Sequence, residues 1–232
     1  EIIKSDAKSP ADLKNTLVSP VSAFAAFSML HSGLRGDSLK NFDIFLALDR
    51  DFAENFDAQS SALLNSLQAP PRPEERRGNP RRPVVAINNS AWSTNGATIR
   101  GRFDFTPTFV TGIKANYQAE VEALDFAQPG SAAIINRWAS LKTNGMINQV
   151  ISPGILRDLV WLLVNATYFE SNWAAKFQAL KAIAAPRFTL LDGKRVAVDM
   201  IRTQGQLNLL ERDDFQAVEI PFHDSDLSFF VV

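Results

Sequence analysis

One stretch of the sequence decides the fold, and it reads Val160-Trp161-Leu162-Leu163-Val164-Asn165-Ala166-Thr167-Tyr168-Phe169. This run of β-branched, aliphatic and aromatic residues is typical of a strand buried within a sheet. Its purely apolar part stops at Asn165, well short of the roughly 18 uninterrupted apolar residues that a membrane span needs. A polar amide inside a buried strand needs hydrogen-bond partners, so Asn165 is expected to bond neighbouring backbone groups.

Further strand patterns accompany this stretch. Residues 84–92 indicate a strand buried on much of both faces, and residues 121–126 alternate as a half-buried strand does. In the second half, strands are predicted at 188–191, 196–201, 207–210, 215–220 and 227–232, with Asp192-Gly193 as a hairpin turn. The glycosylation patterns at 88–90 and 165–167 fall inside predicted buried strands, so we expect neither to carry sugar.

Helix patterns dominate the first half. Ser19 is predicted as the N-cap of a helix that starts at Pro20 and stops at Gly33, buried all round because nearly every residue is small or apolar. Residues 42–67 suggest one or two surface helices, residues 103–117 a short amphipathic one, and Ser131 the N-cap of a helix ending near Gly145. The class is therefore α+β, helix-rich early and strand-rich late.

The composition bounds the function. The chain has 232 residues, 46% of them hydrophobic, with 17 Phe and 4 Trp, which excludes a disordered chain and provides for a real core. There is no Cys, so disulfides, thiolate zinc sites and thiol chemistry are excluded. The formal net charge of −1 gives no long-range attraction to nucleic acid or to an anionic membrane.

A basic, proline-rich stretch at 70–83 predicts a loop. Its basic residues are Arg72, Arg76, Arg77, Arg81 and Arg82. Two glutamates offset part of this charge, and no aromatic residues are interleaved for stacking on bases. A solvated loop is favoured over a polyanion contact, which remains the alternative for these arginines.

The sequence offers few residues that could catalyse a reaction. The chain has two His, far apart in sequence, and no nucleophile elbow, phosphate loop, dinucleotide fingerprint or zinc-binding helix motif. His223 beside Asp224 can be drawn as a base with its carboxylate, but a polar turn between strands is favoured. His31, near the end of a helix, is expected to be a capping or packing group.

Both ends of the sequence bear on its extent. Its first residues show neither an initiator Met nor the pattern of a targeting peptide, so we expect that any such peptide has been removed or was never present. It ends on Leu227-Ser228-Phe229-Phe230-Val231-Val232, a buried-strand pattern with no turn or polar tail after it. We therefore expect the N-terminal piece of a longer polypeptide, with apolar surface and sheet edges that other residues cover.

A series of motifs extends in order along nearly the whole chain. They are Asn15-x-x-x-Ser19-Pro20-x-Ser22, Met29-x-x-x-Gly33-x-x-Gly36-Asp37-Ser38, Asn89-Ser90-Ala91-Trp92, Tyr117-Gln118-Ala119-Glu120, Leu124-Asp125-Phe126, Ile135-Asn136-x-Trp138, Thr143-x-Gly145-x-Ile147, Asn165-Ala166-Thr167-Tyr168-Phe169-x-x-x-Trp173-x-x-x-Phe177, Val218-Glu219-Ile220-Pro221-Phe222 and Asp226-Leu227-Ser228-Phe229. These motifs, in this order, resemble those of the serpin family. The chain departs from the family pattern at Met146, where Lys is usual, and at Glu170 and Ser171, where a basic residue and then Gly are usual.

The resemblance implies one serpin domain over 1–232: helices on a large, mostly antiparallel sheet plus smaller sheets, ending before the reactive centre loop and the C-terminal strands. It implies an inhibitor of serine, alternatively cysteine, endopeptidases rather than an enzyme. Such an inhibitor is a suicide substrate whose cleaved loop inserts into the central sheet. The alternative is a non-inhibitory serpin that acts as carrier, chaperone or storage protein. The reactive bond lies outside this sequence.

The resemblance also assigns roles to residues. Ser19, Ser22 and Asn165, with Asn15 close by, would line the region where the sheet opens, and Trp173 would lie where the loop first enters. Trp138 belongs to the F helix that crosses the sheet. The partners implied are a target protease and the missing C-terminal segment of the chain itself, with no cofactor, metal, nucleic acid or membrane. An extracellular location is implied, with the cytoplasm as the alternative.

Overall fold

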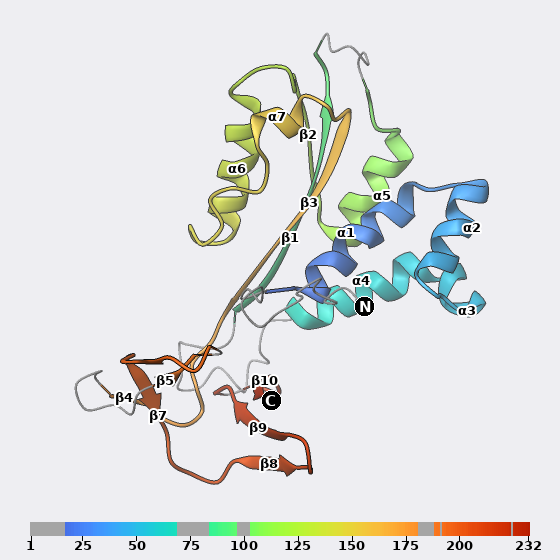
Figure 1. The fold of residues 1–232 in the computed structure, drawn as a ribbon. Coiled ribbons are helices and arrows are strands. Elements are labelled where there is room, and N and C mark those ends of the chain that lie inside the picture. Colours follow the sequence, from blue (N-terminus) through green and yellow to red (C-terminus); the bar gives the residue numbers. More distant parts are fainter. Residues whose placement is uncertain (1–16, 69–83, 97–102, 181–187, 191, 224) are drawn as a thin grey trace, which may run out of the picture. The chain divides into compact units, whose positions relative to one another are not determined.

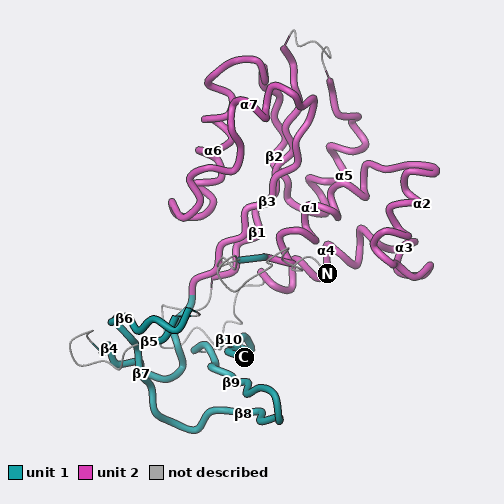
Figure 2. Tube along the Cα trace, in the orientation of Figure 1, with its two compact units in different colours: residues 1–18, 72–83, 171–232 teal, residues 19–71, 84–170 magenta. Residues whose placement is uncertain are grey.

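The computed structural model describes residues 17–68, 84–96, 103–180, 188–190, 192–223 and 225–232. Their contacts divide the chain into two compact units, which Figure 2 colours separately. What we call the first unit comprises residues 19–71 and 84–170, drawn in magenta as unit 2 in Figure 2. The second unit comprises residues 1–18, 72–83 and 171–232, drawn in teal as unit 1. That residues 1–232 form one domain stays a prediction.

A three-stranded sheet organises the first unit. It consists of β1 (Val84–Thr94), β2 (Glu120–Leu124) and β3 (Trp161–Glu170), in the order β2-β1-β3. β2 runs parallel to β1, and β3 runs antiparallel to β1 with Asn89 opposite Asn165. The three strands predicted from the sequence in this region are therefore confirmed, each within two residues of its expected ends.

Helices cover both faces of this sheet (Figure 1). One face packs on α1 (Pro20–Gly33), α4 (Phe56–Gln68) and α5 (Pro107–Tyr117), and the other on α6 (Ser131–Lys142) and α7 (Pro153–Leu156). Because side chains alternate along a strand, Ala91 belongs to the first of these cores and its neighbour Trp92 to the second. The sheet thus separates two apolar clusters, which explains why β1 reads as buried on both faces.

The start of α1 is as the sequence predicts. The Ser19 side chain accepts a hydrogen bond from the Ser22 backbone N–H at 3.2 Å, Pro20 is the first helical residue and the helix ends at Gly33. The expectation that α1 is buried all round is wrong, because Phe27 is 38% exposed. Its apolar composition does not distinguish the face that packs on the sheet from the opposite one.

Residues 36–68 form more helices than predicted. α2 (Gly36–Phe45), α3 (Arg50–Glu54) and α4 replace the one or two expected. The break comes at Asp49, whose carboxylate accepts the Phe52 N–H at 2.8 Å and so caps a new helix start.

Two other helix starts also differ from the expectation. α5 begins at Pro107 and not at Phe103, because the Thr106 side chain caps the Phe109 N–H. Ser131 is the first residue of α6 and not its N-cap, since its hydroxyl donates to the Asp125 carbonyl at 2.6 Å. In each case a local hydrogen bond, which periodicity does not reveal, sets the boundary.

The second unit contains short antiparallel strands. β4 (Gln178–Leu180) pairs with β7 (Met200–Arg202), β5 (Phe188–Thr189) pairs with β6 (Arg195–Val196), and β8 (Asn208–Glu211), β9 (Gln216–Pro221) and β10 (Ser228–Val231) form a sheet in the order β10-β9-β8. The turn at Asp192-Gly193 is confirmed, with Gly193 at a φ of +82°. The single strand predicted at 196–201 is wrong, because β6 and β7 divide that region between two pairings.

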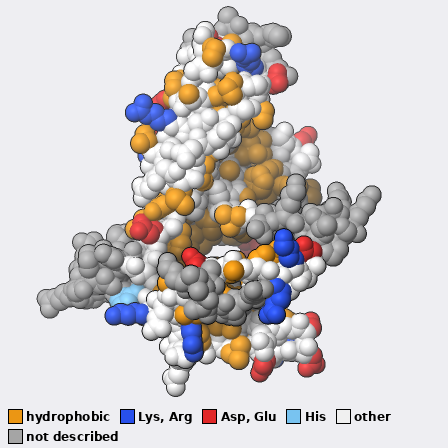
Figure 3. Space-filling model, turned by 60° about the vertical axis from the view of Figure 1, so that its left-hand side comes forward, with side chains coloured by type: hydrophobic (Ala, Val, Ile, Leu, Met, Phe, Trp, Pro, Cys, Tyr) orange, Lys and Arg blue, Asp and Glu red, His pale blue; other side chains and the backbone are white. Residues whose placement is uncertain are grey.

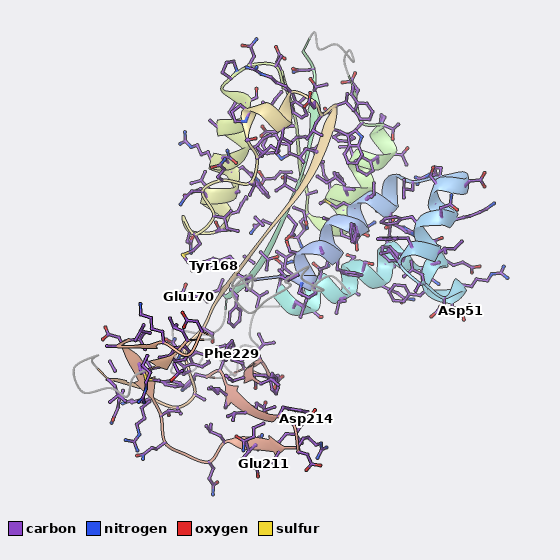
Figure 4. The ribbon with its side chains drawn as sticks, viewed as in Figure 1. Asp51, Tyr168, Glu170, Glu211, Asp214 and Phe229 are labelled. Atoms are coloured by element: carbon purple, nitrogen blue, oxygen red, sulfur yellow. The ribbon has the colours of Figure 1, made fainter. Side chains whose placement is uncertain are left out.

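Glu219 ties the three strands of the β10-β9-β8 sheet together. Its carboxylate accepts hydrogen bonds from Asn208 on β8 at 2.8 Å and from Ser228 on β10 at 2.6 Å, and these bonds hold its pKa below the usual range. Phe229 on β10, labelled in Figure 4, and Phe230 beside it are both exposed. No helix in the described ranges is long and apolar enough to cross a bilayer.

Candidate functional site

Four polar side chains meet where β1 and β3 face α1. They are Ser22 on α1, Asn89 on β1, and Asn165 and Thr167 on β3, and we call them the asparagine cluster. Odd-numbered residues of β1 and β3 point to this face of the sheet, so the antiparallel register brings the two amides opposite each other. Asn89 is buried, whereas Ser22 and Asn165 are half-buried.

Hydrogen bonds connect every member of the asparagine cluster. The Asn165 Oδ1 atom accepts from the hydroxyls of Ser22 and of Thr167, the latter at 2.8 Å. The Asn165 amide donates to Asn89 Oδ1 at 2.9 Å, and the Asn89 amide donates to the Tyr117 carbonyl at 2.9 Å. The cluster therefore joins α1, β1, β3 and the end of α5. In these bonds the partners of the Asn165 side chain are other side chains, and not the neighbouring backbone groups that a buried amide could also use.

Tyr117 also belongs to a second group of polar side chains, together with Asp57 and Ser32. The Tyr117 hydroxyl donates to Asp57 Oδ1 at 2.8 Å, and the Ser32 hydroxyl donates to the same oxygen at 2.7 Å. Burial, followed by the hydrogen bond to Asp57 and the charge of that carboxylate, raises the pKa of Tyr117 well above its usual value. The folded protein thus holds the Tyr117 proton more tightly than the unfolded chain does.

This pKa direction predicts a loss of stability in alkali. The unfolded chain releases its tyrosine protons above about pH 10, while folded Tyr117 keeps its proton. Stability from this group is therefore fully present below that pH and declines above it, by about 1.4 kcal/mol per pH unit for one proton. Denaturant unfolding of the full-length protein between neutral pH and alkaline pH measures the decline.

Substitution separates Tyr117 from other alkaline effects. Tyr117→Phe is expected to remove this component of the pH dependence while costing the Asp57 hydrogen bond at neutral pH. Tyr168→Phe is the matched control, since the chain has two tyrosines and Tyr168 bonds Glu170 near the end of β3 (Figure 4). Equal alkaline slopes for wild type and Tyr117→Phe would contradict the assignment.

The structure brings some predicted site residues together and separates others. Ser22 and Asn165 are in contact, as part of the asparagine cluster. Ser19 is exposed and acts as the helix cap, so its side chain is not a member. Asn15 lies outside the described residues, as do the five arginines Arg72, Arg76, Arg77, Arg81 and Arg82.

The opposite face of the sheet holds α6. Trp138 is buried there and meets Trp92 of β1 edge-on, with ring centroids 6.4 Å apart. The Asn88 side chain donates to the carbonyls of Lys142 at 3.3 Å and Ala166 at 3.2 Å, linking the last residue of α6 to the sheet. Lys142 also pairs with Glu120 at 2.5 Å.

Trp173 lies in the second unit. Its ring stacks on Phe222 at 4.8 Å and meets Phe229 edge-on at 5.9 Å, and Phe177 lies 5.3 Å away. Trp173 also forms an isolated β-bridge with Phe222. The tryptophan thus anchors residues 171–177 to the connection between β9 and β10. That it lies where a loop enters the sheet stays a prediction.

The two histidines lie in different settings, one packed in the core and one in a turn. His31 is buried, stacks on Phe56 at 4.1 Å and lies 2.9 Å from Asp43 through its Nε2 atom, which confirms a packing group. His223 lies in the turn between β9 and β10, and its backbone N–H donates to the Asn172 carbonyl. Asp224 lies outside the described residues.

Sequence reasoning missed several members of the polar groups. Asn89 and Thr167 lie within motifs that assign them no role, and nothing in the sequence links Tyr117 to Asp57. The signal available was the even spacing of Asn165 and Thr167, which places both on one face of a strand. The pairing with Asn89 needed the β1–β3 register, which a single sequence does not provide.

The asparagine cluster suits a reversible structural contact better than catalysis. Its side chains are amides and hydroxyls, which carry no charge at ordinary pH and exchange partners easily. Each bond crosses between segments far apart in the chain, except that from Thr167 to Asn165. Separation of β3 from β1 would break the bond between Asn165 and Asn89, and separation of β3 from α1 would break the bond between Ser22 and Asn165.

Comparison with known proteins gives a consistent result. A model of the family Serpin (serine protease inhibitor) matches residues 3–232. Serine protease inhibitor 42Dd of Drosophila melanogaster is 29% identical over 219 residues, which cover 93% of this chain and 55% of that protein. Neuroserpin of Gallus gallus is 29% identical over 229 residues, covering 94% and 52%. This chain spans about half the length of the curated relatives it matches.

Solved structures agree on the fold. Cleaved Serpin 42Da superimposes with a TM-score of 0.75 at 23% identity, covering 94% of this chain and 54% of that one. Reactive-loop-cleaved human Thyroxine Binding Globulin gives a TM-score of 0.76 at 20% identity, covering 94% and 61%. Both the family model and these structures cover nearly all of the sequence, and this chain belongs to the serpin family.

Proposed function

We propose that the whole protein inhibits a serine-type endopeptidase as a suicide substrate. The protease would cleave an exposed loop, which would then insert as a strand into the sheet that contains β1 and β3. Insertion is favourable because the new strand gains ladder hydrogen bonds and buries alternate side chains. A cysteine protease is the second target class.

The arrangement of the first unit supports this proposal. Within the described ranges, β3 lies at one edge of the β2-β1-β3 sheet. Opening of the sheet requires contacts beneath it that separate and reform. The asparagine cluster supplies such contacts between β3, β1 and α1. This cluster is the observation that carries the proposal.

Each site residue has a proposed part in this mechanism. Ser22 and Asn165 hold the sheet closed through the asparagine cluster, while Ser19 fixes the start of α1 next to it. Trp138 keeps α6 against the sheet until insertion displaces the helix. Trp173 is proposed to lie at the point where the loop enters, and Asn15 close to Ser19.

An inhibition assay with the full-length protein tests the proposal. Incubation with a panel of serine and cysteine proteases is expected to give a protease complex that survives SDS gel electrophoresis, together with loss of protease activity. A catalytically inactive protease variant is the matched control and is expected to give no such complex, because the covalent bond forms during cleavage. Cleavage of the loop without any trapped protease would favour the non-inhibitory carrier, chaperone or storage function.

The proposed location is extracellular, with the cytoplasm as the alternative. Detection of the full-length protein in culture medium and in lysed cells distinguishes the two. A secreted protein would meet extracellular proteases, whereas a retained one would meet those of the cell. The location therefore decides which proteases belong in the inhibition assay.

A further inference from the structure

The C-terminal end of α6 is held to the sheet by polar contacts with two different strands. The Asn88 side chain on β1 donates to the carbonyl of Lys142, the last residue of α6, at 3.3 Å. The Lys142 ammonium group lies 2.5 Å from the Glu120 carboxylate at the start of β2. We call Asn88, Glu120 and Lys142 the α6 latch. Figure 3 brings the α6 side of the molecule forward and shows few charged side chains there, so the latch is not part of a broad charged patch.

The two ends of α6 are attached to the sheet in different ways. Residues 125–130 join the start of the helix directly to β2, and the Ser131 hydroxyl donates to the Asp125 carbonyl at 2.6 Å. At the other end the chain turns at Gly145, which has a φ of +79°, and reaches β3 only after α7. Noncovalent contacts therefore hold the end at Lys142 against the sheet, and the latch supplies polar ones.

The segment that follows α6 is fastened to the helix itself. The Asn136 side chain accepts the backbone N–H groups of Val150 and Ile151 at 2.8 and 3.0 Å, and the Ser140 hydroxyl donates to Asn148 at 2.8 Å. These bonds join the helix to the returning chain and not to the sheet. Release of α6 from the sheet therefore has to break the latch and the apolar packing of the helix, while these bonds can stay intact.

Asn88 contacts β3 as well as α6. Its amide donates to the Ala166 carbonyl at 3.2 Å, and Ala166 lies opposite Asn88 in the register of β1 and β3. Because side chains alternate along a strand, Asn88 points toward α6, whereas its neighbour Asn89 belongs to the asparagine cluster on the opposite face. One amide group thus binds both β3 and the end of α6, and movement of β3 away from β1 would remove one of its two acceptors.

We propose that Asn88 couples the release of the α6 end to the parting of β1 and β3. When β3 moves away, the Asn88 amide loses the Ala166 carbonyl that orients it, and its bond to the Lys142 carbonyl weakens. The Glu120–Lys142 pair is half-exposed, so it adds a contact that salt screens. Asn88 is thus a positioning residue. The proposal rests on the proposed function, which requires this sheet to part.

Amide hydrogen exchange in the full-length protein, measured without any protease, tests the latch. Mass spectrometry of peptides that cover residues 135–147 reports opening of the α6 end. Asn88→Ala is expected to speed this exchange about fivefold, the effect of about one lost hydrogen bond. Lys142→Gln should speed it about twofold at low salt and have no effect at about 1 M salt, where the ion pair is screened. Arg137→Gln, at an exposed cation of the same helix, is the matched control and should change nothing.

A double-mutant cycle tests the coupling. Asn165→Ala loosens β3 from β1 on the opposite face, and it is expected to speed exchange at the α6 end of the otherwise wild-type protein. In the Asn88→Ala background the same substitution should add no further increase, because the link is already lost. Ser140→Ala removes a bond from α6 to Asn148, so in that control background Asn165→Ala should keep its full effect. Thr167→Val replaces Asn165→Ala if circular dichroism shows that the latter does not fold.

Several results would overturn the proposal. They are unchanged exchange at the α6 end in Asn88→Ala, and equal effects of Asn165→Ala with and without Asn88. Equal effects of Arg137→Gln and Lys142→Gln would assign the exchange to the charge of the helix and not to the latch. Absence of any protease complex with the wild-type protein would overturn the proposed function instead, whereas exchange measured without protease would still decide the role of Asn88.

Discussion

Asn165→Ala is expected to weaken the closed sheet more than any other single polar change. The substitution removes the acceptor of the Ser22 and Thr167 hydroxyls and the donor to buried Asn89. Leaving a buried polar group unpaired costs about 1–3 kcal/mol, so we expect a loss of about 2–3 kcal/mol in the free energy of unfolding. In the full-length protein, faster polymerisation on mild heating should accompany this loss, because the proposed function requires the same sheet to open.

A matched asparagine distinguishes this effect from a general loss of polarity. Asn95→Ala, at the end of the same sheet, changes an exposed residue whose side chain donates a long hydrogen bond of 3.4 Å to the Ala123 carbonyl, and it should alter stability by less than about 0.5 kcal/mol. Ser22→Leu places bulk against Asn165 from the α1 side and should act in the same direction as Asn165→Ala. Wild-type unfolding and polymerisation in both variants would remove the asparagine cluster from the proposed mechanism.

The strands and the capped helix could be predicted because their signals are local. Ser19 and Pro20 define the start of α1 by chemistry that operates over three residues. Residues 160–169 indicate a buried strand by composition alone, and the structure places β3 there. By contrast, the starts of α3, α5 and α6 each depend on a single hydrogen bond. The side chains of Asp49 and Thr106 accept theirs from a backbone N–H, and the Ser131 hydroxyl donates its bond to a carbonyl.

The candidate site was only partly predictable, because its members are joined by register. Asn89 faces Asn165 since β3 runs antiparallel to β1, and a shift of one residue would turn the two amides to opposite faces. The family resemblance supplied Ser22 and Asn165 without supplying Asn89 or Thr167. It also grouped Ser19 with them, although the observed cap directs that hydroxyl to the Ser22 backbone N–H.

The apolar surface expected from the strand at the end of the sequence is present. Phe229, Phe230 and Val231 on β10 are exposed within the described residues. The exposed apolar side of α6 was not anticipated, because periodicity cannot tell which apolar stripe of a helix meets a sheet. Ile135 and Trp138 are buried, whereas Ile134 and Leu141 are exposed. Only the packed structure separates the two stripes.

Trp138→Ala is expected to have the largest effect on stability among the apolar changes. The side chain fills the core between α6 and the sheet beside Trp92, and truncation of a buried Trp costs about 3–5 kcal/mol. Denaturant unfolding of the full-length protein measures the loss. Because Trp138 holds α6 in place, the same variant should also expose the edge of Trp92, detectable as a red shift of tryptophan emission.

Conservative changes of the two facing tryptophans test this packing in detail. The Trp138 Nε1 atom is buried without a hydrogen-bond partner among the described residues, so Trp138→Phe loses volume but no hydrogen bond. The Trp92 Nε1 atom donates to the buried Ser90 hydroxyl at 2.8 Å, so Trp92→Phe loses side-chain volume and also leaves the Ser90 hydroxyl without this donor. Trp92→Phe should therefore cost about 1 kcal/mol more than Trp138→Phe. Equal losses would mean that the Ser90 hydroxyl finds another partner, and a larger loss for Trp138→Phe would contradict the unpaired state of its indole nitrogen.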